Sequence, residues 1–401
     1  MSKQIIFCAD GTWNGPEAQT GVSATDSNDN HGEVSGSSVT NVVKLFANLA
    51  GHVTPETLVL QNEQEKLYAD NAGNPSQIMK YLHGVGDSSN PLVKLLGGAF
   101  GMGVIGRIVR GYTYISRNYI AGDAIYIVGF SRGAYTARAL AGMIANVGLL
   151  NPRYCNPSNK ADAYRYGIAA WARSKNTTLQ GAGKLTGLAN AVLNFAENIM
   201  AMQLPADGLI PNVPIKSVAV WDTVGSMGIP KYVGDKRFDV FRFVDTALSN
   251  KVEFGFHAMA IDEVRIDFPV TRWDDRQNIK QVWFVGAHAD VGGGYPPAES
   301  RLSDVALNWM MRKLSGLNVA FATPPVYPPD PQAVGPQIHT PWKNPPFNLM
   351  PTAPRQFLST DTLHASVKGR WNADNAYRPT AMAAFAASGI ASLKTDSDKY
   401  A

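Results

Sequence analysis

One short segment, residues 125–138, constrains the fold of this chain more than any other. The apolar run Ile125-Tyr126-Ile127-Val128 passes into Gly129-Phe130-Ser131-Arg132-Gly133 and then into an alanine-rich helical pattern. A strand that enters a Gly-x-Ser-x-Gly turn and leaves it as a helix is the context in which a serine hydroxyl is exposed on a strained turn. Glycine on both sides lets the backbone fold tightly enough for that geometry. The segment therefore predicts a nucleophile elbow at Ser131, on an α/β sheet.

Other apolar runs along the chain also end abruptly in Gly, Asp, Ser or His, as buried parallel strands do when their carboxyl ends carry functional residues. The five runs are residues 4–8, 77–82, 124–128, 215–220 and 281–285. Helical patterns lie between them at residues 40–50, 105–119 and 134–147. This alternation predicts an α/β-hydrolase-like fold, with a mostly parallel sheet flanked by helices.

Two segments depart from the alternation. Residues 151–214 are too long for an ordinary connection, so we interpret them as an inserted helical cap or lid. After residue 316 prolines become frequent, which is typical of an extended segment. We therefore expect a catalytic domain over residues 1–315 and a proline-rich extension over residues 316–401 that packs on or near it. The residues after 391 look frayed.

A nucleophilic serine needs a base, and the base needs an orienting acid. His288 directly follows a predicted strand and precedes three consecutive glycines, which favours it as the base; Asp222 ends the strand before it. The chain order Ser131, Asp222, His288 is the order found in α/β-hydrolases. His364 is the alternative base and Asp290 the alternative acid.

An oxyanion hole takes one backbone N–H from the residue after the nucleophile and another from an early strand-to-helix loop. Arg132 supplies the first. The loop Asp10-Gly11-Thr12 follows the first predicted strand, so Gly11 or Thr12 is the expected second donor, with Asp10 shaping the turn.

Two other readings of these residues stay open. Asp10, Asp222 and Asp290 all lie at predicted strand ends and form the carboxylate set of a Mg²⁺-dependent phosphohydrolase. Against this, the aspartate common two positions before Asp10 in such sites is replaced by Cys8. The other reading is a catalytically idle scaffold that keeps the fold. The serine mechanism needs neither a cofactor nor a metal.

Composition excludes several classes of protein. The net charge of +4 is too small to indicate nucleic-acid binding, and 45% hydrophobic against 17% charged residues excludes disorder of the whole chain. Two cysteines cannot build a disulfide framework. The sequence has neither a signal-peptide pattern nor a run long enough to span a bilayer. We therefore expect cytoplasmic synthesis, with any export by a non-Sec route.

Several blocks of this sequence together resemble a known family. They are Phe7-Cys8-Ala9-Asp10-Gly11-Thr12-Trp13-Asn14, Thr40-Asn41-Val42, Gly84-Val85-Gly86, residues 129–138, Trp221-Asp222-Thr223-Val224-Gly225 and residues 288–295. In this order they are similar to an α/β-hydrolase domain family that includes bacterial type VI secretion lipase effectors with phospholipase activity. The resemblance implies that Ser131, Asp222 and His288 form a triad that cleaves phospholipid acyl esters. It also implies a secretion apparatus and an immunity protein as partners.

The lipid expectation has separate support in two apolar segments. Residues 91–109 combine bulky apolar side chains with Lys94 and Arg107, and residues 185–202 have apolar residues at helical spacing. Both compositions suit a membrane interface, and both also suit ordinary packing on the core. The predicted substrate is therefore a lipid at a membrane surface, with a non-lipid ester as the alternative.

Overall fold

The structure of this protein is a computed structural model. The described residues are 2–11, 38–58, 63–84, 100–179, 203–224, 231–233, 236–238, 247–330, 337–344, 347–349 and 351–396. The predicted segment 185–202 and part of segment 91–109 lie outside them, as does Thr12.

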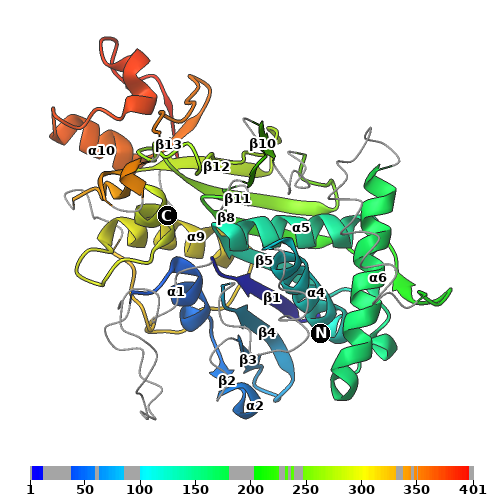
Figure 1. Cartoon of the computed structure of the whole chain (residues 1–401). Helices are drawn as coiled ribbons and strands as arrows, with labels where there is room; N and C mark the ends of the chain where they lie inside the picture. The colour runs from blue at the N-terminus through cyan, green and yellow to red at the C-terminus, as the bar shows by residue number, and fades with distance from the viewer. Residues whose placement is uncertain are drawn as a thin grey trace, which may run out of the picture.

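A ten-stranded sheet forms the centre of the molecule (Figure 1). Its strand order is β14-β13-β12-β11-β8-β5-β1-β4-β3-β2. All neighbouring pairs are parallel except β2 with β3 and β3 with β4, so the sheet is mostly parallel. The strands are β1 (Gln4–Ala9), β2 (His52–Val53), β3 (Glu63–Ala69), β4 (Pro75–Leu82), β5 (Ala124–Phe130), β8 (Ile215–Trp221), β11 (Val252–Ala260), β12 (Ile279–Phe284), β13 (Thr362–His364) and β14 (Lys394–Asp396).

Helices cover both faces of this sheet. The longer helices are α1 (Asn41–Asn48), α4 (Phe100–Asn118), α5 (Arg132–Val147), α6 (Lys160–Leu179), α9 (Arg301–Ser315) and α10 (Ala365–Ala373). The shorter elements are α2 (Pro55–Leu58), α8 (His288–Gly292), the β6–β7 pair (Leu149–Leu150, Leu209–Ile210), the β9–β10 pair (Lys231–Val233, Lys236–Phe238), and 3₁₀ turns at Pro152–Tyr154, Pro157–Asn159, Pro341–Lys343, Phe347–Leu349 and Thr380–Phe385.

The side-chain alternation of β1 explains why the sheet has a hydrophobic core on each of its two faces. Ile5 and Phe7 point into one core with residues of α4 and α5, whereas Ile6 and Cys8 point into a second core with residues of α1 and α9. Successive side chains of a strand face opposite sides of its sheet, so a strand that is apolar at every position must be covered on both faces. The expected α/β-hydrolase-like sheet flanked by helices is confirmed.

Each of the five expected strands is present, as β1, β4, β5, β8 and β12. The sequence analysis missed β11, which lies between β8 and β12. Its sequence, Val-Glu-Phe-Gly-Phe-His-Ala-Met-Ala, carries Glu253, Gly255 and His257 and so breaks the apolar run. His257 is nevertheless fully buried, and its Nε2 accepts a hydrogen bond from the N–H of Thr223.

The C-terminal segment belongs to the same sheet. Residues near 320 run beside the end of α1, where Ala50 donates to Ala320 and Ala322 donates to Asn48. Farther along, β13 pairs with β12, and β14 pairs with β13. The expectation that the chain is frayed after residue 391 is therefore wrong for Lys394–Asp396, because the edge of the sheet provides backbone partners that no local pattern reveals.

The insertion over residues 151–214 contains α6, which packs against α4 and α5. Its function as a lid stays a prediction. Among the described helices, none combines the length and the apolarity that crossing a bilayer requires.

The start of α5 lies tightly against the end of β1. A Cβ atom at Gly133 would overlap the carbonyl oxygen of Ala9 and stand 2.6 Å from the carbonyl carbon of Asp10. Neither backbone atom can move without disturbing the β1 ladder. We expect Gly133→Ala to lower the free energy of unfolding by about 3 kcal/mol, as overpacked sites do, measured by denaturant titration.

Gly142 on the same helix is the matched control. A Cβ atom there meets nothing within 4 Å. Because alanine is a better helix former than glycine, Gly142→Ala should raise the free energy of unfolding by up to about 1 kcal/mol. Equal effects of the two substitutions would contradict the close contact at Gly133.

Candidate active site

Ser131 occupies the turn between β5 and α5. Its backbone has φ 56° and ψ −123°, a conformation that side chains larger than hydrogen rarely adopt. The N–H of Ser131 donates to the carbonyl of Trp221 (3.2 Å), and its own carbonyl accepts from the N–H of Tyr135 (3.2 Å). The turn is thus fixed between β8 and the first turn of α5, at the carboxyl end of the sheet.

The structure brings His288 to Ser131 from across the sheet. His288 begins the short helix α8, directly after β12. Its Nε2 lies 2.9 Å from the Oγ of Ser131, and its Nδ1 lies 2.5 Å from the Oδ2 of Asp222. With Nδ1 protonated toward the carboxylate, Nε2 is the acceptor for the serine hydroxyl.

The imidazole of His288 is held on several sides. The ring of Phe130 is 4.7 Å away between centroids, and the ring of Phe268 is 5.1 Å away. The backbone N–H of His288 donates to Oε2 of Glu263 (3.1 Å). Aromatic packing and one backbone hydrogen bond therefore limit the orientations that the base can take.

Asp222 ends β8 and is completely buried. Its N–H donates to the carbonyl of Ala258 (2.7 Å), and its Oδ1 accepts from the N–H of Ala260 (2.8 Å). Arg355 donates through Nη1 to Oδ1 (2.6 Å) and through Nη2 to Oδ2 (2.9 Å). The carboxylate thus has donors on both oxygens.

Backbone strain is concentrated at these residues. Of the described residues other than glycine, four have positive φ: Ser131, Asn212, Asp222 and Asn318. Asn tolerates this region, but serine and a buried aspartate adopt it only where the surroundings enforce it. Two of the four thus belong to the Ser131–His288–Asp222 cluster.

The electrostatics of the pair follow from burial and from Arg355. Burial alone would raise the pKa of Asp222, but Arg355 and His288 together hold it well below its usual range. Burial lowers the pKa of His288 below its ordinary value of 6.5, although the hydrogen bond that its Nδ1–H donates to Asp222 acts to raise this pKa. At neutral pH the site therefore contains an ionised carboxylate and a neutral imidazole.

The two alternative residues make other contacts. His364 lies at the end of β13, where its Nδ1 pairs with the Oγ of Ser366 (2.9 Å) and its ring stacks on Phe284 at 4.5 Å. Asp290 accepts from the N–H of Ala287 (2.9 Å) and pairs with Nδ1 of His339 (2.6 Å). The group that the structure places at Ser131 is His288, and the carboxylate that it places at His288 is Asp222.

The loop after β1 lies beside the serine turn, as the close approach of Asp10 to Gly133 requires. Asp10 is fully buried, and its Oδ2 accepts from the hydroxyls of Thr40 (2.7 Å) and Tyr81 (2.9 Å). The N–H of Gly11 donates to the Oδ1 of Asp10 (2.7 Å). The expected donor at Gly11 is therefore engaged by its own neighbour in this structure, while Thr12 lies outside the described residues.

Two arginines, Arg107 and Arg132, belong to the region around the loop after β1 and the start of α5. Nη2 of Arg107 donates to the carbonyl of Leu82 (3.4 Å) and to that of Asp10. Burial and the charge of Arg107 lower the pKa of Arg132 to about 10, which still leaves it charged at neutral pH. Positive charge thus belongs to the region of the loop after β1 and the start of α5.

The three aspartates that suggested a magnesium site do not form one cluster. Each is engaged separately: Asp10 by two hydroxyls, Asp222 by Arg355 and His288, and Asp290 by His339. Within the described part of the chain, no three His, Cys, Asp or Glu side chains lie together in a way that could hold a metal ion. The donor sets therefore do not fit the Mg²⁺ site of the alternative interpretation.

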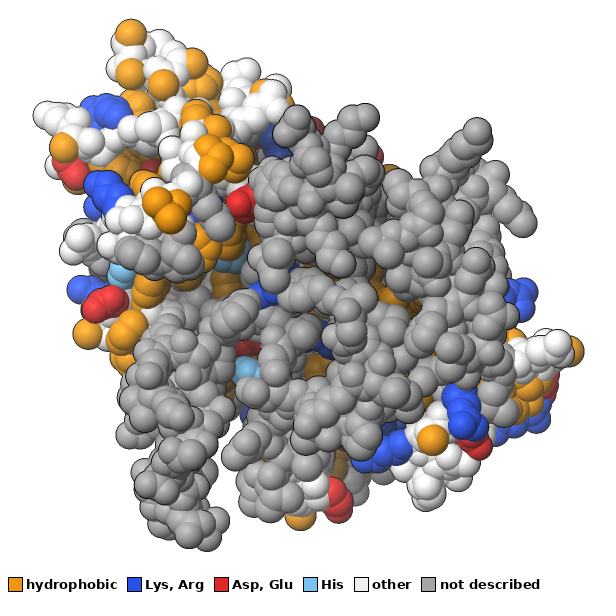
Figure 2. Space-filling view, viewed as in Figure 1, with side chains coloured by type: hydrophobic (Ala, Val, Ile, Leu, Met, Phe, Trp, Pro, Cys, Tyr) orange, Lys and Arg blue, Asp and Glu red, His pale blue; other side chains and the backbone are white. Residues whose placement is uncertain are grey.

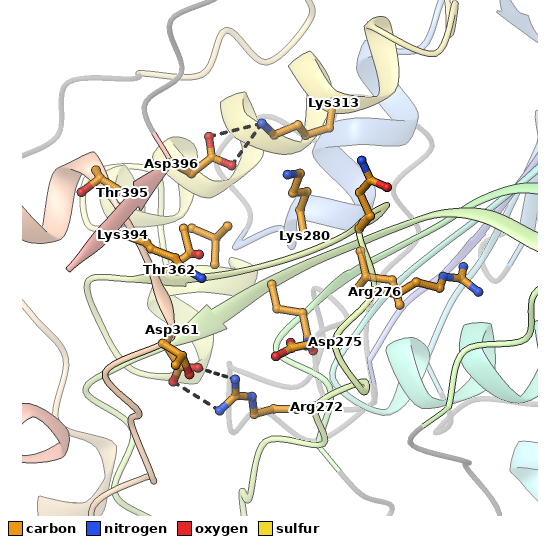
Figure 3. Close-up of a pocket in the computed structure, with 15 residues that line it drawn as sticks. Arg272, Asp275, Arg276, Lys280, Lys313, Asp361, Thr362, Lys394, Thr395 and Asp396 are labelled. Carbon is orange, nitrogen blue, oxygen red and sulfur yellow. Dashed lines mark hydrogen bonds and ion pairs between the residues drawn. The ribbon is translucent and has the colours of Figure 1, made fainter.

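Two hollows elsewhere in the molecule are not lined by Ser131, His288 or Asp222. The larger, about 940 Å³, lies where β12, β13 and β14 begin (Figure 3). Two ion pairs line it, Arg272 with Asp361 and Lys313 with Asp396. The smaller, about 480 Å³, includes Asp262, whose carboxylate accepts from Tyr377 and from the N–H of Gly286.

Sequence analysis missed three residues around this site. Arg355 lies in the proline-rich segment, where no periodic pattern indicates a role. Glu263 and Phe268 follow the strand β11 that was itself missed. Recognition of β11 would have placed the Glu263 loop at the carboxyl edge of the sheet, next to Asp222.

A family model matches most of the chain. Residues 3–313 match a family model described as the catalytic domain of Tle1-like phospholipase effectors of the type VI secretion system (T6SS). An uncharacterized protein of Saccharomyces cerevisiae is 36% identical over 101 residues, which are 21% of this chain and 15% of that protein.

Two solved structures are also similar to this chain. The crystal structure of an uncharacterized protein from Pseudomonas aeruginosa is 16% identical, with a TM-score of 0.38, over 80% of this chain and 46% of that chain. The structure of the Tle1 effector bound to the VgrG spike from the type VI secretion system is 18% identical, with a TM-score of 0.36, over 75% of this chain and 53% of that chain. This chain thus spans about half the length of those two proteins.

The family match covers more than half of the chain and includes the serine turn, the end of β8 and the start of α8. This chain therefore belongs to the family of Tle1-like T6SS phospholipase effector catalytic domains.

Proposed function

We propose that this chain is a serine hydrolase that cleaves acyl ester bonds of phospholipids. One observation carries the proposal: the hydrogen-bonded series from Ser131 Oγ through the His288 ring to Asp222, built on a strained turn between a strand and a helix. Membership of a phospholipase effector family supports the lipid substrate.

Each residue has a separate task in this mechanism. Ser131 attacks the ester carbonyl while the Nε2 of His288 takes its proton, and His288 then returns that proton to the leaving alcohol. Asp222 holds the imidazole and stabilises the imidazolium that forms. Water, activated in turn by His288, releases the acyl group from Ser131.

The negative charge on the carbonyl oxygen needs hydrogen-bond donors. We assign this task to the N–H of Arg132, at the start of α5, where the helix dipole also favours an anion. The N–H of Gly11 joins it once substrate displaces the hydrogen bond to Asp10.

Aromatic side chains near His288 and an exposed leucine support an acyl chain as the bound group. Phe268 lies against His288, and Phe347 lies 5.9 Å from Phe268 between ring centroids. Leu349, two residues farther along, is 89% exposed. On the face drawn in Figure 2, hydrophobic side chains also gather over the segment that contains α10. Such exposed apolar groups suit contact with a lipid surface.

The guanidinium groups of Arg107 and Arg132 support a phosphate-bearing substrate. Arg107 donates to the carbonyl of Asp10, next to the start of α5 where Arg132 lies, and arginine pairs with phosphate oxygens through two parallel hydrogen bonds. Membership of the same family also supports delivery by the T6SS, a route that uses no Sec signal. The proposed partner is therefore a component of that secretion apparatus.

The test is fluorophosphonate labelling of the purified protein, read by intact mass, followed by hydrolysis of a phospholipid and short-chain ester panel. We expect a single adduct and release of fatty acid from phospholipid vesicles, unaffected by a chelator. Cleavage of short esters alone would leave the serine mechanism but move the substrate to a non-lipid ester. Hydrolysis that a chelator abolishes, with no adduct, would instead favour a metal-dependent phosphohydrolase.

The pH dependence follows from the pKa of His288. The imidazole must be neutral to take the serine proton, and burial lowers its pKa below 6.5. Asp222 stays ionised throughout, because its pKa lies well below the usual range. We therefore expect kcat/KM on a soluble ester to keep more than half of its plateau value at pH 6.5 and to reach the half-maximal point only at a lower pH. A half-maximal point above pH 6.5 would contradict this assignment of the base.

A further inference from the structure

We propose that Arg355 is a positioning residue of the hydrolytic site, which orients the carboxylate of Asp222 toward His288 and keeps it charged. This inference rests on the proposed function and extends it to a residue that lies beyond residue 313, where the family match ends. The hydrolytic site of this chain thereby depends on the C-terminal segment as well as on the matched domain.

Arg355 and Asp222 form a bidentate ion pair. Its two terminal nitrogens donate to the two oxygens of Asp222, at 2.6 Å and 2.9 Å. The same nitrogens donate to the backbone carbonyls of Ala260 and Phe268, both at 2.7 Å. A bidentate guanidinium–carboxylate pair fixes the plane of the carboxylate as well as its distance from the guanidinium. Oδ2 is thereby aimed at Nδ1 of His288.

The backbone around Arg355 is itself fastened beside the site. The N–H of Ala353 donates to the carbonyl of Val264 (2.8 Å), and Thr352 forms a bridge with Arg265. These contacts join the C-terminal segment to the loop that follows β11. Arg355 therefore reaches Asp222 from a fixed backbone.

Burial makes the pair necessary rather than incidental. The side chain of Asp222 is 0% exposed and that of Arg355 is 5% exposed. A carboxylate without water around it reverts to the neutral acid unless a positive charge compensates it. His288 cannot provide this compensation before the reaction, because it must start neutral to act as the base. Arg355 is the cation that the structure places on both carboxylate oxygens.

Loss of Arg355 raises the proton affinity of the Asp222–His288 pair. Without the cation, the pKa of Asp222 rises, since burial already opposes its charge. As long as Asp222 stays ionised, the imidazolium of His288 is also favoured by the loss of a positive charge on its partner carboxylate, so the pKa of His288 rises. Both changes move the acid side of the pH–activity profile to higher pH. Among the described residues, the other charged or titratable groups facing the pair are His257 on β11 and Glu263 with Arg265 in the following loop, and the substitution leaves these three residues unchanged.

The experiment compares Arg355→Met and Arg355→Lys with the wild-type full chain. For Arg355→Met we expect kcat to fall about 100-fold with KM little changed, the effect of a misplaced catalytic group. We also expect the acid limb of its pH–activity profile to move to higher pH by about 1 unit. Arg355→Lys keeps the charge but loses the planar fork, so kcat should fall about 10-fold while the acid limb stays close to that of the wild type.

Arg378→Met is the matched control. Arg378 is an exposed arginine of the same segment, and it donates to the backbone carbonyls of Trp371, Asp374 and Tyr377. It should keep the wild-type kcat and pH profile. A folded Arg355→Met with the wild-type kcat and acid limb would overturn the proposal. If Arg355→Met does not fold, wild-type kcat in Arg355→Lys overturns it equally.

A second readout separates this inference from the proposed function. The titration of His288, followed by NMR of its Nδ1 proton, needs no turnover. A higher His288 pKa in Arg355→Met, beside wild-type values in Arg378→Met, supports the positioning role even if the wild type forms no fluorophosphonate adduct. An unchanged titration overturns the role even if Ser131 proves to be the nucleophile.

Discussion

Replacement of Ser131 with alanine is expected to lower kcat about 10⁶-fold, the loss seen when the nucleophile of a serine hydrolase is removed. The Oγ of Ser131 is the atom within reach of Nε2 of His288, at 2.9 Å. Without it no acyl-enzyme forms, so the fluorophosphonate adduct should disappear as well. The measurements are intact mass after labelling and fatty-acid release from phospholipid vesicles.

Ser217→Ala provides the control for this experiment. Ser217 is a fully buried serine on β8, next to β5, and its Oγ has no hydrogen-bond partner among the described residues. Removal of this hydroxyl leaves no donor or acceptor unpaired, so labelling and kcat should match the wild type. If Ser131→Ala kept most of the activity, the nucleophile would be assigned wrongly.

Replacement of Asp222 with asparagine is expected to lower kcat about 10⁴-fold, because an amide in this position favours the wrong tautomer of His288. The same change should cost stability. Arg355 would remain as a buried cation without its counter-charge, a situation that costs about 3–5 kcal/mol. Steady-state kinetics and denaturant titration of the same preparation measure the two effects.

Two further aspartate variants test whether the effect is specific. Asp361 also pairs in a buried position with an arginine, Arg272, but at the far end of β13 from His364 (Figure 3). Asp361→Asn should therefore lose stability and keep kcat. Asp290→Asn should keep most of the activity, because Asp290 pairs with His339 rather than with His288. A larger loss of kcat in Asp290→Asn than in Asp222→Asn would make Asp290 the acid.

The carboxyl edge of the sheet could be read from local patterns. Each predicted strand is an apolar run, and a polar residue follows its end, as Ser131 does after β5 and Asp222 after β8. Because parallel strands end at one edge, residues that follow such runs meet there. This geometry is why Ser131, Asp222 and His288 were predicted together, although their roles remain proposals.

Which residues surround these three is decided by contacts between segments that lie far apart in the sequence. His364 also comes after Ser131 and Asp222 in the chain, so the chain order left both histidines open as the base. The structure distinguishes the two histidines because His288 follows β12 whereas His364 ends β13, and these strands occupy different positions in the sheet. The strand β13 is only three residues long. No local pattern fixes so short a strand, since its stability comes from the neighbour with which it pairs.

The sequence alone determined the mostly parallel α/β fold, the strained serine turn and the identity of the strand ends, because these follow from apolar runs, glycine spacing and chain order within about 15 residues. Tertiary structure alone decided which base meets Ser131, that Gly11 is engaged by Asp10, and that Arg355 lies on Asp222. The physical reason is the range of the interactions: Arg355 and Asp222 are 133 positions apart, and the pairing of two buried charges leaves no periodic trace in either segment.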